Sequence, residues 1–148
     1  MIQPTFCKSF ATVLILALFT VSSAAQIGRR FPSEKKIVTD PVTGVQLTFL
    51  TSTPAGDSKI YQTHRQWTAD GKWLIFRSNR VPGETLAVNE ETGDIVQVTD
   101  GGYMGMLCIA KKSMKLYYLR MALRQVGQTK GGPVQVVEVD LEKLFADS

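Results

Sequence analysis

The sequence predicts an all-β fold built from short antiparallel strands. Its apolar residues fall in runs of strand length that are rich in Val, Ile, Tyr, Phe and Trp, which are the residue types that strands favour. Turn-forming pairs such as Asp70-Gly71, Pro82-Gly83 and Thr92-Gly93 separate these runs at close intervals, as in proteins made of sequential hairpins. Beyond the first 25 residues, no stretch longer than about two turns has a helical period.

Seven strands are expected in chain order, joined by tight turns that use the positive φ open to glycine. They are Ile60–Thr68, Trp73–Ser78, Thr85–Asn89, Ile95–Thr99, Met104–Ala110, Leu116–Met121 and Val134–Leu141. Residues 141–146 are expected to form a short helix. The side chains expected to be largely buried are Trp67, Leu74, Phe76, Val96, Leu107, Leu116 and Tyr118.

Two internal matches indicate that the strands repeat. The stretch Asp70–Phe76 lines up with Lys112–Tyr118 at an offset of 42 residues, and Asp40–Thr51 lines up with Asn89–Asp100 at an offset of 49. Sheets of four strands that recur every 40–50 residues are the blades of a β-propeller. The predicted fold is therefore a β-propeller of four-stranded antiparallel blades, rather than an isolated sandwich.

The propeller is expected to be incomplete in this chain. A propeller has about four to eight blades, whereas these residues supply about two, together with an N-terminal hairpin at residues 36–51. That hairpin resembles the third and fourth strands of a blade whose first two strands are absent, and it is expected to stand apart or to pack on an open edge. We interpret residues 36–148 as the N-terminal part of a propeller domain, with the remaining blades supplied by a longer chain.

The N-terminal residues have the layout of a secretory signal peptide. Lys8 precedes the mostly apolar stretch 9–21, and the small residues Ser23, Ala24 and Ala25 suit a signal peptidase. A membrane anchor is the alternative, but the apolar stretch is short for a spanning helix, which needs about 20 residues. We expect a signal peptide at residues 1–25, a linker at 26–35, and a periplasmic or secreted protein with no stable membrane association after cleavage.

Charge and cysteine content exclude several classes of function. The formal net charge of +4 is spread along the chain, without the dense basic stripe of a nucleic-acid-binding protein, so no nucleic-acid partner is expected. Loss of the signal peptide removes Cys7 and leaves Cys108 as a single thiol, which cannot form an internal disulfide. Cys108 lies in an apolar run and is expected to be buried.

The repeat also resembles a known family. Residues 67–80, WTADGKWLIFRSNR, followed by ETGDIVQVTD, resemble the Tol-type propeller repeat of exported proteins, with Thr68-Ala69 in place of the common Ser-Pro and Asn79 inside the Ser-x-Arg. The opening DPVTGVQLTFLT, the His64 stretch and the GGYMG…KKSMKLYYLR continuation are similar to the start of oligogalacturonate lyases. These enzymes are propellers that break down pectin, and the resemblance covers about residues 39–120.

The resemblance implies β-elimination on an acidic oligosaccharide. It also implies a divalent metal, with manganese as a candidate, held by several histidines and a glutamine beside a separate catalytic histidine. His64 is the one histidine of this chain, so no metal site or cofactor is expected within it, the catalytic residues are expected beyond Ser148, and the segment itself is expected to be inactive. Candidate substrate-binding residues are His64, Arg65, Arg80, Tyr103 and Arg120, since arginine binds carboxylates in a bidentate manner.

Two other functions remain open from the sequence. One is a non-enzymatic exported propeller that binds protein or glycan, and the other is a propeller that gates a downstream peptidase domain. His64 also has two interpretations, as a substrate contact or as a packed or hydrogen-bonded strand histidine, and Arg80 could be an ordinary solvated loop charge. From the predicted strand order, Arg80, Tyr103 and Arg120 are expected on or near one loop face.

Overall fold

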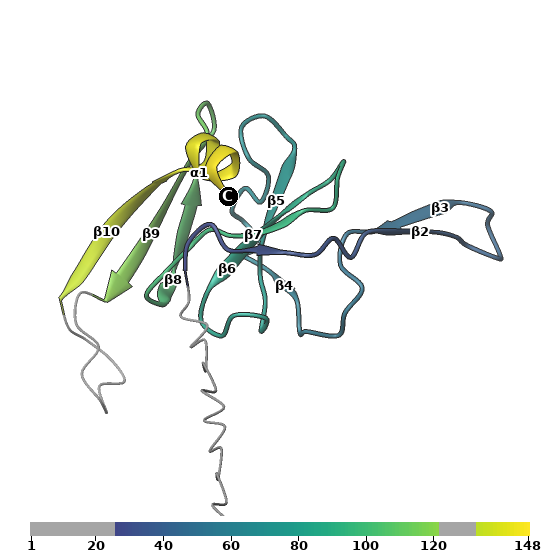
Figure 1. The fold of residues 1–148 in the computed structure, drawn as a ribbon, viewed down its shortest axis with the longest axis horizontal. Coiled ribbons are helices and arrows are strands. Elements are labelled where there is room, and N and C mark those ends of the chain that lie inside the picture. Colours follow the sequence, from purple (N-terminus) through teal and green to yellow (C-terminus); the bar gives the residue numbers. More distant parts are fainter. Residues whose placement is uncertain (1–25, 122–132) are drawn as a thin grey trace, which may run out of the picture.

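The computed structural model describes residues 26–121 and 133–148, which fold mainly into antiparallel sheets (Figure 1). The expected signal peptide at 1–25 lies outside the described residues. The strands are β1 (Arg30–Phe31), β2 (Lys36–Thr39), β3 (Gln46–Phe49), β4 (Ser58–Lys59), β5 (Trp73–Arg77), β6 (Thr85–Asn89), β7 (Ile95–Gln97), β8 (Tyr103–Ile109), β9 (Lys115–Met121) and β10 (Val134–Asp140), followed by helix α1 (Leu141–Asp147). No helix among the described residues has the length and apolar character needed to cross a membrane.

The first sheet has the order β1-β7-β6-β5-β4, so that β4 to β7 form a meander. Its turns lie at the glycines that were expected to form them. Gly71 has φ of 74° and Gly83 has φ of 84°, a backbone conformation that residues with a Cβ rarely adopt. Thr68 and Asp70 stabilise the turn before β5, because the Thr68 hydroxyl donates to Asp70 and accepts from the Trp73 amide. The all-β prediction and the positions of the strands from β5 onward are confirmed.

The second sheet has the order β10-β9-β8, and α1 follows its last strand. Asp140 caps the helix, since its carboxylate accepts from the Lys143 amide at 3.0 Å, as an N-cap residue does. The Phe145 ring stacks on Trp73 of the first sheet, with ring centroids 3.9 Å apart. The helix therefore covers one end of the boundary between the two sheets (Figure 1), and the expected short helix at 141–146 is confirmed.

A hydrophobic core lies between the two sheets. Alternate residues of each strand point into it, as the pleat requires: Trp73 and Ile75 come from β5, and Leu116 and Tyr118 come from β9. A smaller cluster on the other face of the first sheet contains Phe76, Leu86, Val88 and Ile95. Of the expected core, the residues confirmed as buried are Phe76, Val96, Leu107, Leu116 and Tyr118, whereas Trp67 and Leu74 are only half-buried.

The β2–β3 hairpin repeats the β6–β7 hairpin 49 residues earlier. The Asp40 carboxylate accepts from the amides of the residues two and three positions later, at 2.7 and 2.9 Å. The side-chain oxygen of Asn89 accepts from the amides two and three positions after it, at 2.9 and 3.0 Å. In both turns the backbone carbonyl of this residue accepts from the glycine four places on, Gly44 or Gly93, at 2.9 Å. The match that the sequence indicated is thus a match in hydrogen bonding, and the hairpin stands apart from the two sheets (Figure 1).

Two segments differ from the sequence expectations. Ile60–Thr68 is not a strand: β4 ends at Lys59, and the chain leaves the sheet until Trp67 forms a single bridge with Leu74. This stretch has no apolar alternation between Tyr61 and Gln66, so no face of it can be buried as a strand face. The expected linker at 26–35 contains β1, which pairs with β7.

Candidate functional site

A cavity of about 610 Å³ lies between residues 63–65 and the outer face of the second sheet. Its lining includes residues that alternation along the strands turns away from the core, namely Cys108, Tyr117, Leu119 and Val136. Three residues of the core face also line it: Leu107, Ile109 and Tyr118. The expectation that Cys108 is buried is therefore wrong, since its thiol is exposed. Apolar walls with a few polar groups at the rim are typical of ligand pockets.

His64 and Arg65 enter this cavity from the segment that leaves the first sheet. The His64 amide donates to the Tyr61 carbonyl at 2.9 Å, and the two rings lie 5.3 Å apart at 56°. The Arg65 guanidinium donates to the Lys111 carbonyl at 3.1 Å, which fixes the segment against the β8–β9 turn. His64 is exposed and lies outside the strands, so it is not packed within a strand, and its role in substrate binding stays a prediction.

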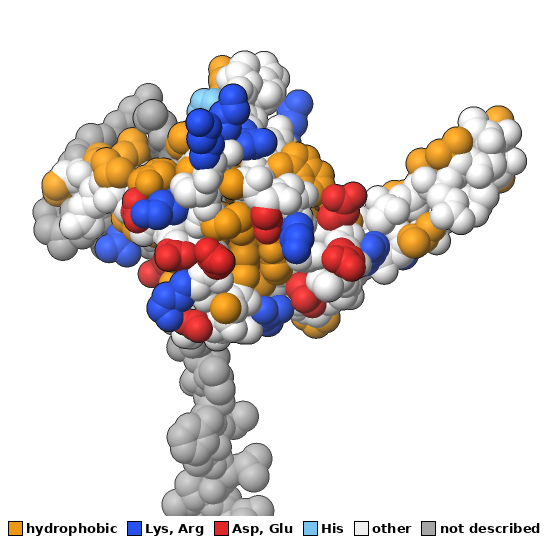
Figure 2. Space-filling view, turned by 90° about the horizontal axis from the view of Figure 1, so that it is seen from above, with side chains coloured by type: hydrophobic (Ala, Val, Ile, Leu, Met, Phe, Trp, Pro, Cys, Tyr) orange, Lys and Arg blue, Asp and Glu red, His pale blue; other side chains and the backbone are white. Residues whose placement is uncertain are grey.

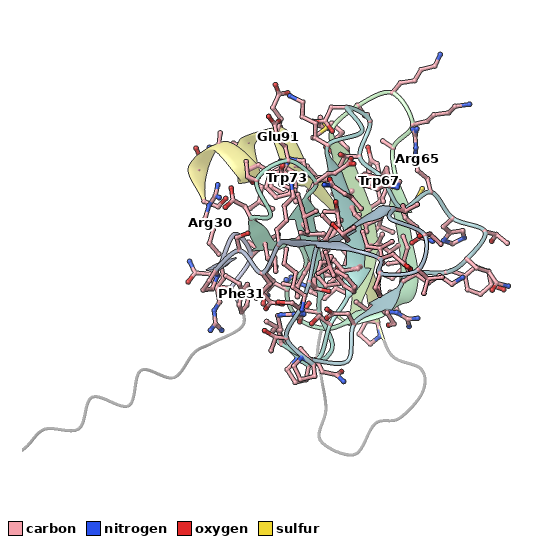
Figure 3. The ribbon with its side chains drawn as sticks, turned by 90° about the vertical axis from the view of Figure 1, so that its right-hand side faces the viewer. Arg30, Phe31, Arg65, Trp67, Trp73 and Glu91 are labelled. Carbon is pink, nitrogen blue, oxygen red and sulfur yellow. The ribbon has the colours of Figure 1, made fainter. Side chains whose placement is uncertain are left out.

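Positive charge gathers beside this cavity. Arg65 lies against the turn that carries Lys111 and Lys112, and all three side chains are exposed. Figure 2 shows Lys and Arg side chains grouped next to the single histidine, and Figure 3 shows Arg65 close to that end of the molecule, on the same side as two extended Lys side chains. A cluster of cations at the rim of an apolar pocket favours an anionic ligand.

Arg80 lies in a different environment, inside a cluster of charges. Its guanidinium donates to both carboxylate oxygens of Glu34, at 3.1 and 2.7 Å, and to the Asp57 carboxylate. It also donates to the Ser78 hydroxyl at 2.7 Å, and only 7% of the Arg80 side chain is exposed. A substrate carboxylate would have to displace one of these partners, so the geometry favours a structural role; substrate binding by Arg80 stays a prediction.

The Glu34 carboxylate joins three separate parts of the chain. Besides Arg80, it accepts from the amides of Ser52 and Thr53 at 2.9 Å each. Desolvation raises the pKa of the Glu34 carboxyl, but the hydrogen bonds from Arg80 and from Thr53 and Ser52 outweigh it and lower the pKa to about 2. The cluster therefore fastens both ends of the β2–β3 hairpin to the first sheet.

This pKa predicts an acid-sensitive stability. Because the Glu34 pKa of about 2 in the folded state lies below the ordinary glutamate value of 4.5, the unfolded chain binds more protons between these values. The stabilisation is complete above about pH 4.5 and is lost as the pH falls toward 2. We expect a loss of about 1–2 kcal/mol over this range, measured by urea unfolding at each pH. Glu34→Gln should flatten this part of the profile, and an unchanged slope would contradict the assignment.

Tyr103 and Arg120 lie at the other end of the second sheet from the β8–β9 turn. They are paired in the β8–β9 ladder, and Arg120 also contacts Gln135 at 3.5 Å. The buried Glu84, in the same β5–β6 connection as Arg80, accepts from the Gly102 amide at 2.7 Å. The structure thus brings the β5–β6 connection, which carries Arg80, to the same end of the sheets as Tyr103 and Arg120. His64 and Arg65 lie apart from them, in the cavity. The binding roles of all five residues stay predictions.

Tyr61, Tyr117, Lys111 and Lys112 belong to the surroundings of His64 and were not among the sequence candidates. Tyr117 could have been found from the alternation of Leu116-Tyr117-Tyr118, which places one tyrosine on each face of β9. The described residues, 26–121 and 133–148, include no cluster of three or more His, Cys, Asp or Glu side chains able to hold a metal ion. They do not fit a metal centre, and no catalytic step through a metal can be assigned to them.

The fold and its repeated hairpins define a class: an all-β protein of sequential antiparallel sheets. Among solved structures, the chain is similar to an oligogalacturonate lyase from Vibrio parahaemolyticus, with a TM-score of 0.60 and 25% identity over 80% of this chain and 29% of that one. It is also similar to an oligogalacturonate lyase in complex with manganese, with a TM-score of 0.57 and 22% identity over the same shares. The resemblance to this family is thereby confirmed.

The chain spans about 29% of the length of these lyases. No family model and no curated protein matches it. The comparison establishes a fold relationship at the family level for these residues.

Proposed function

We propose that this chain is the N-terminal part of an exported β-propeller enzyme that cleaves oligogalacturonate by β-elimination. The observation that carries the proposal is the similarity of 80% of the chain to the two lyases. The repeated hairpins at an offset of 49 residues support the propeller arrangement, because blades are copies of one sheet. The signal-peptide pattern of residues 1–25 supports export to the periplasm or the medium.

The proposed reaction has two chemical requirements. A base removes the proton at C5 of the uronate, next to the carboxylate; a C4–C5 double bond forms and the C4–O bond breaks, so that the leaving oxygen takes up a proton. The charge that develops on the carboxylate must be stabilised by cations placed against it. In the lyase whose structure contains manganese, the metal is a candidate for that role, and in our proposal the metal ligands and the base come from the remainder of the polypeptide.

This chain would contribute to substrate binding. The segment at 60–66 interrupts the strand that would be innermost in a blade, so His64 and Arg65 would face the central channel of the closed propeller. The Arg65 guanidinium, supported by the exposed charges of Lys111 and Lys112, would bind a uronate carboxylate, for which its planar group is suited. The substrate would be an acidic oligosaccharide, and neither nucleic acid nor membrane is part of the proposal.

An absorbance assay tests the proposed activity. β-Elimination leaves an unsaturated uronate that absorbs in the ultraviolet, so turnover can be followed directly in the presence of a divalent metal. Residues 26–148 alone should give no turnover, because they carry one histidine and no metal cluster among the described residues. The same sequence followed by the remaining blades should be active.

Three outcomes would contradict this account. Sustained turnover by residues 26–148 would contradict the assignment of the catalytic groups to later blades. Inactivity of the folded longer polypeptide, combined with retained binding of oligogalacturonate, would favour a propeller that binds glycan without cleaving it. A downstream hydrolase domain in that polypeptide would favour a gating propeller instead.

A further inference from the structure

Tyr61 is an aromatic side chain that lies exposed near the basic side chains at the rim of the cavity. It is 60% exposed, and its ring contacts the His64 ring, with the two centroids 5.3 Å apart. The His64 amide donates to the Tyr61 carbonyl at 2.9 Å, so a turn holds the two rings together. An exposed ring in a fixed position offers a flat apolar surface, against which the C–H face of a sugar ring can pack.

The cations near Tyr61 form a basic patch, defined by the side chains of Arg65, Lys111 and Lys112. Neither residues 58–69 nor residues 101–121 contain an Asp or a Glu. Within the described part of the chain, no ion pair involves the basic patch. The carboxylate of Glu138 on β10 is bound by Lys115 instead, at 2.6 Å. The basic patch therefore keeps its positive charge for an anionic ligand.

Arg65 is fixed in position but retains donors for a ligand. A guanidinium has five N–H donors, and Nη1 of Arg65 donates to the Lys111 carbonyl at 3.1 Å. Arg80, by contrast, is paired with the carboxylates of Glu34 and Asp57. The remaining donors of Arg65 can therefore bind a carboxylate in the bidentate manner that suits a guanidinium. A side chain that is positioned in advance loses less conformational entropy when it binds.

The basic patch is distant from Tyr103 and Arg120. β8 has seven residues, so that its two ends lie about 20 Å apart. Tyr103 lies opposite Arg120 at the start of β8, whereas Arg65 is bonded to Lys111, beyond the last residue of β8. No single sugar residue spans this distance, so the basic patch and Tyr61 form a site of their own.

We propose that Tyr61 and the basic patch form an anchoring site for an acidic oligosaccharide, which binds the sugar without the catalytic centre. Arg65 binds the carboxylate of one uronate, the Tyr61 ring packs on the C–H face of a neighbouring sugar, and the two lysines attract further carboxylates of the same molecule. The identity of the sugar rests on the proposed function. The site adds an anchor that holds the substrate and takes no part in the elimination step.

Calorimetric titration of residues 26–148 with pentagalacturonate tests the anchoring site. Binding is expected, and it should weaken as salt is added, because exposed charges are screened. The fully methyl-esterified pentasaccharide keeps the sugar rings without the charges, and polyglutamate keeps the charges without the rings. Each should bind about tenfold more weakly or worse, because one of the two anchoring contacts is lost. Absence of binding to pentagalacturonate, or equal binding of either control ligand, would overturn the proposal.

Matched variants assign the binding to the two anchoring side chains. Arg65→Ala and Tyr61→Ala should each weaken it by about tenfold, a usual effect of truncating an arginine or tyrosine anchor, whereas Tyr61→Phe keeps the ring and should retain binding. Lys36 and Phe49 are a matched pair of cation and aromatic ring on the β2–β3 hairpin, 5.3 Å apart. Lys36→Ala and Phe49→Ala should leave the affinity unchanged. Equal losses in the hairpin variants, or full affinity in both Arg65→Ala and Tyr61→Ala, would overturn the proposal.

The anchoring site and the lyase proposal can fail separately. Binding by residues 26–148, combined with inactivity of the folded longer polypeptide, would support the anchor and contradict the lyase. In an active longer polypeptide, Arg65→Ala and Tyr61→Ala should each raise KM by about tenfold and leave kcat nearly unchanged, because an anchor binds substrate and transition state equally. Unchanged KM in both variants would overturn the anchor and leave the lyase intact. Binding that is lost in Arg120→Ala but kept in Arg65→Ala would also overturn it.

Discussion

Replacing Arg80 by alanine should lower the free energy of unfolding by about 3 kcal/mol or more, because breaking a buried ion pair leaves its partners uncompensated. The Arg80 side chain is 7% exposed, and Glu34 and Asp57 are its carboxylate partners. Both carboxylates would be left without the guanidinium that pairs with them. Urea unfolding followed by tryptophan fluorescence measures the change.

Arg77→Ala is the matched control for this prediction. Arg77 lies three residues earlier, is exposed, and donates to the Lys59 carbonyl at 3.2 Å. Its removal should change the free energy of unfolding by about 0.5 kcal/mol or less, as is usual for surface substitutions. Equal effects of the two variants would mean that the Arg80 cluster is not a special source of stability.

Replacing Phe76 by alanine should cost about 3–5 kcal/mol, the usual loss when a buried phenylalanine is truncated. Phe76 is 5% exposed and packs with Leu86, Val88 and Ile95 on the outer face of the first sheet. The strand that carries Phe76, β5, is paired with β4 on one side and with β6 on the other, so it cannot shift to close the resulting cavity. A loss of this size is a large fraction of the 5–15 kcal/mol that stabilises a typical domain.

Phe49→Ala is the control of the same chemistry. Phe49 lies in β3, is 42% exposed, and has the Lys36 ammonium 5.3 Å from its ring centre. Its truncation in residues 26–148 should cost about 1 kcal/mol or less, because little apolar area leaves a buried environment. A larger loss for Phe49 than for Phe76 would contradict the assignment of the core.

Much of the fold could be predicted because its strands have a clear pattern of apolar residues in the sequence. In β5 and β9 the apolar residues recur on both faces, and glycine turns bound the strands. The failed strand at Ile60–Thr68 shows the limit of this reasoning. Tyr61 and Thr63 have high strand propensity, yet propensity reflects packing on a half-buried surface. The polar residues between Ile60 and Trp67 do not form such a surface.

The candidate site was harder to predict because its groups are brought together by long-range contacts. Glu34 and Asp57 lie far from Arg80 in the sequence, and nothing local to any of them indicates the ion cluster. Arg65 could be named from the suitability of arginine for carboxylates, but its position depends on a bond to the Lys111 carbonyl, 46 residues away. Cys108 was misassigned because an apolar run does not tell which face of an edge strand another sheet covers.

The central claim, that this chain belongs to a polypeptide that cleaves oligogalacturonate by elimination, is tested most directly by the mass of the products. Mass spectrometry of the digest formed by the longer polypeptide should show pairs of products whose masses sum to that of the substrate, with one member unsaturated. Products that together carry one added water would identify a hydrolase and contradict the account, and so would an intact substrate after incubation with the folded, metal-supplied protein.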